Sequence, residues 1–228
     1  MVRSLGFVLC FLASLAFGDV ESRVVDIKIQ NLYAPFGYDD NDEVTVVLDG
    51  YLPDTCFKLA TTEVEHKGDK ITIKQHAREY SGNCFDVTVP FTVTVKLGVL
   101  PLGSYEVVAG TATERLTVKE ATKAGPDDYL YAPVDAARVE KQTAILSGRF
   151  TNSCLKIDSV QRNHTSKTVQ VLPIMKLLTP TEAGKECVAG EFPFEQKVSL
   201  ADLKLDNGRH LLHVRSLDGQ SINTVFKP

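Results

Sequence analysis

Five cysteines are the residues of this chain whose chemistry can be read most directly from the sequence. Cys10 lies in an apolar N-terminal run, and the other four are Cys56, Cys84, Cys154 and Cys187. No CxxC pair and no histidine at zinc-site spacing accompanies these four, so disulfide bonds are favoured over a zinc site. Four cysteines allow three pairings, and the internal repeat described below selects one of them.

The densest acidic stretch, residues 38–43, offers the hard oxygen ligands that calcium takes. An EF-hand loop that begins at Asp39 needs glycine at its sixth position and glutamate at its twelfth. Val44 and Gly50 stand there instead. We therefore interpret the stretch as a solvated loop ahead of a strand, and we predict neither a metal site nor a cofactor.

The histidines do not form a recognisable catalytic or metal-binding group. His210 and His213 fall in one expected strand, where alternation places them on opposite faces. His66, His76 and His164 have polar neighbours and are interpreted as surface residues. The sequence holds no G-x-S-x-G or H-E-x-x-H motif. We predict a non-catalytic protein, with a triad assembled from distant residues as the alternative.

Aromatic side chains gather around the first long expected strand. Tyr33 has a counterpart in the second half of the chain, Tyr131, and both are interpreted as core or domain-junction residues. Phe36, Tyr38 and Tyr51 have no aromatic counterparts there. Because folding of the second half does not require them, we expect these three to form a partner-binding surface.

The second half of the chain repeats the first. Leu32-Tyr33-Ala34-Pro35 recurs as Leu130-Tyr131-Ala132-Pro133, and the same offset carries Cys56 to Cys154. Cys84 corresponds to Cys187 at a slightly larger offset. Further matches in the same order are Thr45 with Thr143, Leu48 with Leu146, Gly50 with Gly148, Asp54 with Asn152, Thr55 with Ser153, and Pro90-Phe91 with Pro193-Phe194. The correspondence predicts one domain of about 95 residues that is present twice.

The repeat also sets the domain boundaries and the disulfides. Each copy holds one cysteine pair, which predicts Cys56–Cys84 and Cys154–Cys187, each stabilising its domain by roughly 3–4 kcal/mol. We expect the first domain over residues 19–118 and the second over 129–228. The linker between them, residues 119–128, is polar and contains Gly-Pro.

Within each copy the apolar residues alternate with a period of two, and no sustained helical period is present. Examples are Val44–Val46, Ile71–Ile73, Phe85–Val89 and Phe91–Val95, with Leu211–Val214 in the second copy. Six or seven such strands in about 95 residues predict an all-β fold of two tandem antiparallel β-sandwiches.

One segment supports a more specific likeness. Leu100-Pro101-Leu102-Gly103-Ser104-Tyr105-Glu106-Val107 resembles the corner before a late strand of immunoglobulin-like domains, and the L-P-x-G-x-Y-x-V segment of exported bacterial β-sandwich modules. The resemblance implies a largely buried Tyr105 whose hydroxyl binds the backbone of residues 97–102. His210 replaces that tyrosine in the second copy, and we expect it to bind residues 200–205. The chain has no Trp, so the resemblance extends to the architecture only.

The N-terminus predicts export. Arg3 precedes an apolar run, and Ala16-Phe17-Gly18 supplies the small residues of a cleavage site, so we interpret residues 1–18 as a signal peptide. The mature chain would be secreted or periplasmic, which suits disulfides. Asn163-His164-Thr165 is a glycosylation acceptor only in a eukaryotic secretory pathway.

The function expected from the sequence is a non-catalytic binding or structural module that contacts another protein or an envelope component. The alternative is a secreted inhibitor or ligand-binding protein that uses its loop ends. The formal net charge is −4 and no basic cluster is present, so nucleic acid is excluded as a partner.

Overall fold

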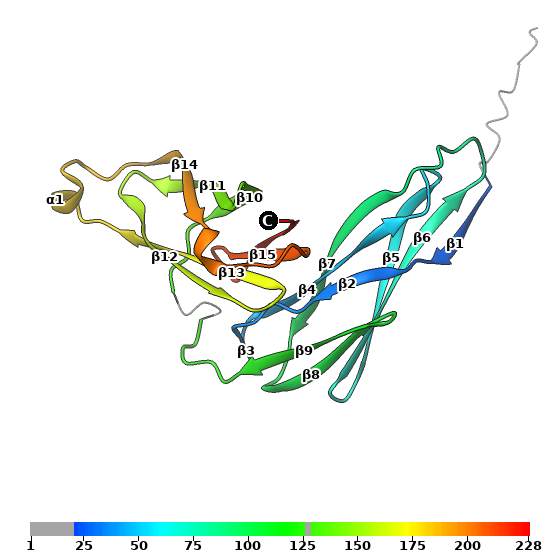
Figure 1. Ribbon diagram of the computed structural model, residues 1–228. Helices are drawn as coiled ribbons and strands as arrows, with labels where there is room; N and C mark the ends of the chain where they lie inside the picture. Colours follow the sequence, from blue (N-terminus) through cyan, green and yellow to red (C-terminus); the bar gives the residue numbers. More distant parts are fainter. Residues whose placement is uncertain (1–20, 126–128) are drawn as a thin grey trace, which may run out of the picture.

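The computed structural model describes residues 21–125 and 129–228, which we call the first and second halves. The predicted signal peptide, residues 1–18, and linker residues 126–128 lie outside the described residues. The described chain is all-β apart from one helical turn, α1 (Pro180–Ala183), and one 3-10 turn, η1 (Ala201–Leu203). Figure 1 shows two groups of strands that meet near the middle of an elongated molecule.

The first half forms two sheets. One contains β2 (Ile29–Tyr33), β4 (Glu43–Leu52) and β7 (Val89–Val99), in that order. The other has the order β1-β6-β8-β9-β3. β1 and β8 pair with different stretches along one edge of β6, and β5 pairs along the other edge. The strands of this sheet are β1 (Ser22–Asp26), β3 (Tyr38–Asp39), β5 (Phe57–Lys67), β6 (Lys70–Tyr80), β8 (Gly103–Ala109) and β9 (Ala112–Lys119).

The second half has the same order of strands. One sheet contains β10 (Val134–Glu140), β11 (Thr143–Asn152) and β14 (Ala189–Ser199). The other contains β12 (Leu155–His164), β13 (Thr168–Leu177), β15 (His210–Arg215) and β16 (Ser221–Phe226). Thus β2-β4-β7 corresponds to β10-β11-β14, and β5-β6-β8-β9 corresponds to β12-β13-β15-β16.

The sheets are not wholly antiparallel, which differs from the expectation. β6 pairs with β8 in parallel, β13 pairs with β15 in the same way, and the short β3 is parallel to β9. The chain leaves β6 for the opposite sheet, runs through β7, and returns to β8 in its original direction. In an immunoglobulin domain, the strand that corresponds to β5 would pair with the strand that corresponds to β8. Here β5 pairs with β6 and lies at the sheet edge.

Each half buries its own apolar core between its two sheets. Val46 and Leu48 of β4 pack with Ile71 and Ile73 of β6 in the first half, and Leu146 packs with the second-half core. Leu212 and Val214 of β15 belong to that second core. Alternation along the strands supplies these inward side chains, as the period of two predicts.

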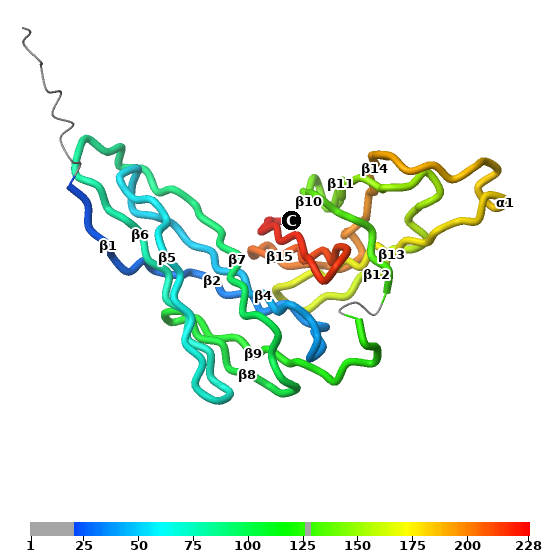
Figure 2. The backbone as a smooth tube through the Cα atoms, turned by 180° about the vertical axis from the view of Figure 1, so that it is seen from behind, coloured from blue at the N-terminus to red at the C-terminus, as the bar shows by residue number. Residues whose placement is uncertain are grey.

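Two strands are buried on both faces. In β4 every residue from Val44 to Gly50 is buried, and all six residues of β15 are buried. Their inward side chains form the two cores, and their outward side chains face the other half of the molecule. Val47 of β4 and Leu211 of β15 meet there with Tyr33 in a separate apolar cluster. Figures 1 and 2 show this contact where the ends of β2 and β4 approach β13 and β15.

One strand prediction was wrong. Residues 81–88 have no regular structure and are exposed throughout, and β7 begins only at Val89. Phe85 and Val87 alternate with polar residues as in a strand, but Phe85 is held by hydrogen bonds to Thr55 instead of a ladder.

Candidate functional sites: the junction and the disulfide clamps

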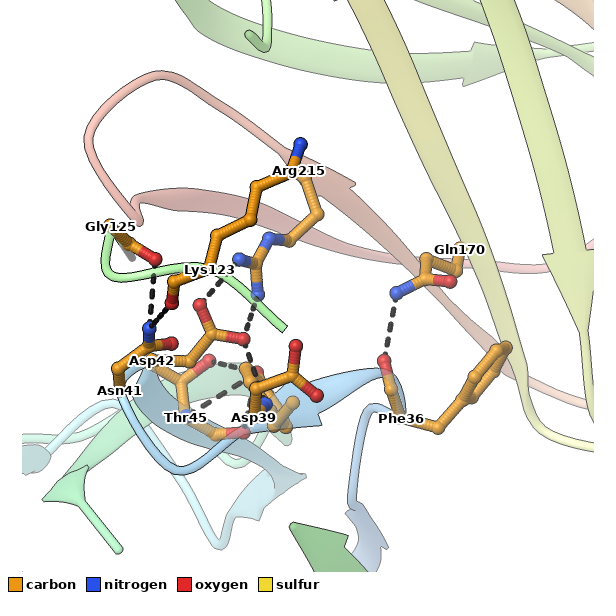
Figure 3. A network of polar contacts seen from close by, with 10 residues as sticks. Phe36, Asp39, Asn41, Asp42, Thr45, Lys123, Gly125, Gln170 and Arg215 are labelled. Atoms are coloured by element: carbon orange, nitrogen blue, oxygen red, sulfur yellow. Dashed lines mark hydrogen bonds and ion pairs between the residues drawn. The ribbon is translucent and has the colours of Figure 1, made fainter. Parts of the chain in front are cut away.

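The contact between the halves, which we call the junction, is centred on a buried ion pair. Arg215 Nη2 donates to Asp42 Oδ1 over 2.7 Å and Arg215 Nη1 donates to Asp42 Oδ2 over 3.2 Å. The two side chains are only 5% and 4% exposed. The Arg215 guanidinium also lies over the rings of Tyr38 and Tyr131 at 5.8 and 5.6 Å. A bidentate pair of this kind fixes direction as well as distance, so it favours one docked orientation (Figure 3).

Tyr38 and His213 touch across the junction, edge to face, with ring centroids 5.9 Å apart. The Tyr38 hydroxyl bonds to both the hydroxyl and the carbonyl of Thr45, and burial raises its pKa. His213 is fully buried, and its Nδ1 lies 2.8 Å from Asn223 Oδ1, while Nε2 has no hydrogen-bond partner among the described residues. Burial, partly offset by the hydrogen bond with Asn223 and assisted by the charge on Arg215, lowers the pKa of His213 to about 4. His213 is therefore neutral at pH 7.

A second charged contact lies farther along β4. Asp49 is fully buried and accepts from Asn31 Nδ2 over 2.7 Å and from the Tyr33 hydroxyl over 3.1 Å. Arg209 of the second half reaches the same carboxylate with its Nε at 3.1 Å. The Arg209 guanidinium also lies 5.6 Å from the Tyr51 ring and donates to the Tyr51 hydroxyl. Burial, followed by the charge of Asp49, raises the pKa of Tyr33.

Polar contacts to the loop before β4 complete the junction. Gln170 Nε2 donates to the Phe36 carbonyl over 2.7 Å. Asn41 Nδ2 donates to the carbonyls of Lys123 and Gly125, at 2.9 and 2.8 Å. The described part of the linker is thereby held against the first half, as Figure 3 shows. The acidic stretch at residues 38–43 thus binds the other half and the linker.

These contacts correct the expected partner surface. Tyr38 is 1% exposed, so its assignment to that surface was wrong. Phe36 is half-buried at the junction, and Tyr51, although 39% exposed, packs under Arg209. The Tyr38 and Tyr51 rings and the Phe36 carbonyl contact the second half. Tyr33 and Tyr131 are buried at the junction, as predicted.

The two disulfides have the predicted pairing, Cys56–Cys84 and Cys154–Cys187, with Cα–Cα distances of 5.4 and 5.3 Å. Hydrogen bonds reinforce the first. The Cys56 amide donates to Asp54 Oδ1, and the amide of Tyr80 donates to the Cys56 carbonyl. The Phe85 amide donates to Thr55 Oγ1 over 2.9 Å, and the Thr55 amide donates back to the Phe85 carbonyl. We call this disulfide and its four hydrogen bonds the first clamp.

The second clamp repeats these bonds one for one. The Cys154 amide donates to Asn152 Oδ1, and the Leu178 amide donates to the Cys154 carbonyl. The Val188 amide donates to Ser153 Oγ over 3.1 Å, and the Ser153 amide donates to the Val188 carbonyl over 2.9 Å. The sequence pairs Asp54 with Asn152 and Thr55 with Ser153 therefore preserve an acceptor oxygen at each place.

Each clamp holds an exposed apolar residue directly after its second cysteine. Phe85 is 77% exposed and Val87 is 56% exposed beside the first clamp, and Val188 is 53% exposed in the second. Leu177, next to the second clamp, is 61% exposed. These exposed residues were not predicted, because the alternation over residues 85–89 indicates a strand. The available signal was Phe85 itself, which directly follows Cys84 and the polar stretch Ser81-Gly82-Asn83.

The remaining predicted residues have mixed outcomes. The Tyr105 hydroxyl donates to the Pro101 carbonyl over 2.8 Å, as predicted, but the residue is half-exposed because the corner lies at the sheet end. His210 is buried and its Nε2 lies 3.1 Å from the carbonyl oxygen of Asp206, just beyond the expected segment. His76 was wrongly assigned to the surface. Its side chain is 13% exposed, with Nδ1 2.7 Å from Asp26 Oδ1.

Comparison with known proteins supports a β-sandwich module. Residues 46–118 match the family model described as "ORF11 beta-sandwich domain". The match runs from within β4 to within β9 and includes the first clamp. No curated protein and no solved structure matches the chain. Among the described residues, no helix is long and apolar enough to cross a membrane.

Proposed function

We propose that the chain is an exported, non-catalytic binding protein built from two duplicated β-sandwich domains, over residues 19–118 and 129–228. The repeated strand order and the repeated clamps support the duplication. The two disulfides suit an oxidising compartment, in line with the predicted signal peptide. The immunoglobulin-like relationship is proposed at the level of architecture, since the β6–β8 pairing is parallel.

The observation that carries the proposal is the presentation of Phe85. Phe85 and Val87 are 77% and 56% exposed and lie two residues apart beside the first clamp, and apolar side chains that are exposed together mark a contact surface. The first clamp fixes the backbone of Phe85, so little conformational entropy is lost when a partner binds. Rigid aromatic anchors that enter a partner pocket dominate many interfaces. Both the amide and the carbonyl of Phe85 are bonded to Thr55, so the side chain is the part available to a partner.

Sheet edges are poorer candidates for a partner contact. The edge strands β7 and β14 contain Pro90 and Pro193, and proline cannot donate to an added strand. β5 and β12, also at edges, have register shifts near Leu59 and Ile157. Such irregularities protect edges from pairing. The clamps at the loop ends are therefore favoured as the contact surface.

Catalysis has no support from the histidine contacts. His76 bonds to Asp26, His210 to Asp206 and His213 to Asn223. None of these partners is a hydroxyl or thiol nucleophile, whereas nucleophilic catalysis requires one beside its base.

The proposal is tested with Phe85→Ser in the exported protein. We expect chemical crosslinking in the native envelope or medium to join the wild-type chain to a partner, and Phe85→Ser to lose that product. Leu102→Ser is the matched control, because Leu102 is 59% exposed on the β7–β8 corner away from the clamps. Retention of the product by Phe85→Ser, or equal loss in both variants, contradicts the proposal.

A ligand-binding role is the second candidate. β1 and β8 pair with different stretches of β6, and a hollow of about 290 Å³ lies between them, lined by Ile27, Ile29 and Ile73 among others. Its size is at the lower limit for a small-molecule site. A small apolar ligand that raises the melting temperature of the wild type but not of Ile27→Arg would support this role.

A further inference from the structure

The two clamps lie at opposite ends of the molecule. Figures 1 and 2 show the β6–β7 connection, which contains Cys84 and Phe85, at one extremity. The α1 segment, which precedes Cys187 and Val188, lies at the other. Each end therefore carries an exposed apolar side chain on the same local arrangement of hydrogen bonds.

The junction holds these ends in one relative arrangement. The buried Asp42–Arg215 pair, the Asp49–Arg209 contact and the apolar cluster around Leu211 join the halves at separate points on β4 and the turn before it. Contacts at several separate points oppose both rotation and sliding. The distance between the clamps is thereby fixed by the fold and not by the linker.

We propose that the chain is a rigid bivalent bridge whose two clamps bind like sites on an exported protein partner. This inference rests on the proposed function and adds the valency and the type of partner. Each site on the partner would be an apolar pocket, because Phe85 and Val188 are the side chains presented. Asp86 follows Phe85 and Glu186 precedes Cys187, so the pocket rims carry basic residues. A partner with two such pockets is a dimer or an assembly of identical subunits.

Rigidity makes the second contact effective. When one clamp is bound, the other is held at a high local concentration, provided that the spacing of the partner sites matches. Binding at both ends exceeds either single affinity by about 10²–10⁴-fold under those conditions. Duplication of a whole domain, with its clamp retained, supplies this gain without a new type of binding surface.

Site-specific photocrosslinking tests the inference. A benzophenone amino acid is placed at Phe85 or at Val188 of the full exported chain, in the cells that produce it. Thr113, exposed near the start of β9, is the control position. We expect both clamp positions to crosslink to the same segment of the same protein, and the control to give no such product. If only Phe85 crosslinks, or if the positions label different proteins, bivalency is overturned and the proposed function stands. If neither labels a protein, or if both label lipid, both proposals fail.

Affinity measurements with the crosslinked partner provide a second test that separates contact from bridging. Phe85→Ser and Val188→Ser change exposed side chains, so both variants should fold. Each is expected to weaken binding by about 10²-fold or more, and the double variant to abolish it. Unchanged affinity of Val188→Ser for a partner that Phe85→Ser loses would overturn the bridge.

Discussion

At the scale of single residues, burial decides the role of the polar side chains on β4, on β15 and in the turn before β4. Asp42, Asp49 and Arg215 are each less than 5% exposed, and a buried charge is tolerated only when it is paired. Asp42 and Arg215 pair with each other, and Asp49 pairs with Arg209 of the second half. Asp49 also accepts hydrogen bonds from two residues of β2. Such pairs add little net stability compared with apolar residues of the same size, but they penalise any other docked arrangement.

His213 makes the junction sensitive to acid. Its pKa is about 4 in the folded protein and 6.5 when exposed, so the unfolded chain binds a proton more readily. The contribution of His213 to the free energy of unfolding is therefore fully present above pH 6.5, and it is lost as the pH falls through about 4. The loss amounts to about 3 kcal/mol. We expect NMR titration to give His213 a pKa near 4, with urea unfolding showing the matching loss.

His164→Gln, which changes an exposed histidine, is the control and should keep the pH dependence of the wild type. His213→Met should have a smaller difference in unfolding free energy between pH 7 and pH 4.5. A His213 pKa above 6 would show that the ring is hydrated and not buried.

At the scale of elements, the sequence predicted what depends on local pattern. Alternation located most strands, and the repeated sequence pattern located both disulfides because it assigns one cysteine pair to each half. The alternation pattern failed at Phe85–Thr88, where two hydrogen bonds to Thr55 hold an exposed segment whose apolar and polar residues alternate as in a strand. The pattern also did not predict the burial of Tyr38, because that ring packs both in the first-half core and against His213 and Arg215 of the other half. One signal was available, since Leu211, His213 and Arg215 occupy the outward face of a strand without the usual solvated pattern.

The β10–β11 hairpin contains a strained turn that can be relieved. Lys141 and Gln142 both have positive φ, at 44° and 61°, as a type I′ turn requires. Non-glycine side chains are disfavoured there by roughly 1–2 kcal/mol per residue. The double change Lys141→Asn and Gln142→Gly should raise the free energy of unfolding by about 1 kcal/mol. The Gln142 carbonyl, which accepts from the Leu200 amide, is retained. A decrease in stability would show that the native side chains stabilise the turn.

The two disulfides should differ in their reactivity toward thiols. Cys84 is exposed, whereas Cys154 is 1% exposed and its bond is shielded on that side. Thiol–disulfide exchange needs access to a sulfur atom. Without denaturant, dithiothreitol should reduce Cys56–Cys84 at least roughly tenfold faster than Cys154–Cys187. Differential alkylation followed by peptide mass spectrometry measures both rates, and full unfolding provides the control in which the rates converge.

At the scale of the whole molecule, the junction joins two folded halves through charged and apolar contacts. Each half has a separate apolar core, and the cluster of Tyr33, Val47 and Leu211 is the apolar contact between them. The polar contacts around this cluster come from strands whose inward faces stabilise the two cores. Docking and folding are therefore linked through β4 and β15, because a shift of either strand disturbs a core as well as the junction.

Replacement of Arg215 tests this linkage. Arg215→Met removes the guanidinium and leaves Asp42 buried without its partner, which costs about 3–5 kcal/mol when the carboxylate cannot reach water. Asp42 reaches water if the halves separate, so we expect the variant to undock. Calorimetry should show one unfolding transition for the wild type and two for Arg215→Met, and trypsin should cleave faster after Lys123 in the linker. The double variant Asp42→Leu with Arg215→Met removes both charges and should restore a single transition. One transition with an unchanged midpoint in Arg215→Met would mean that the apolar cluster alone holds the halves together.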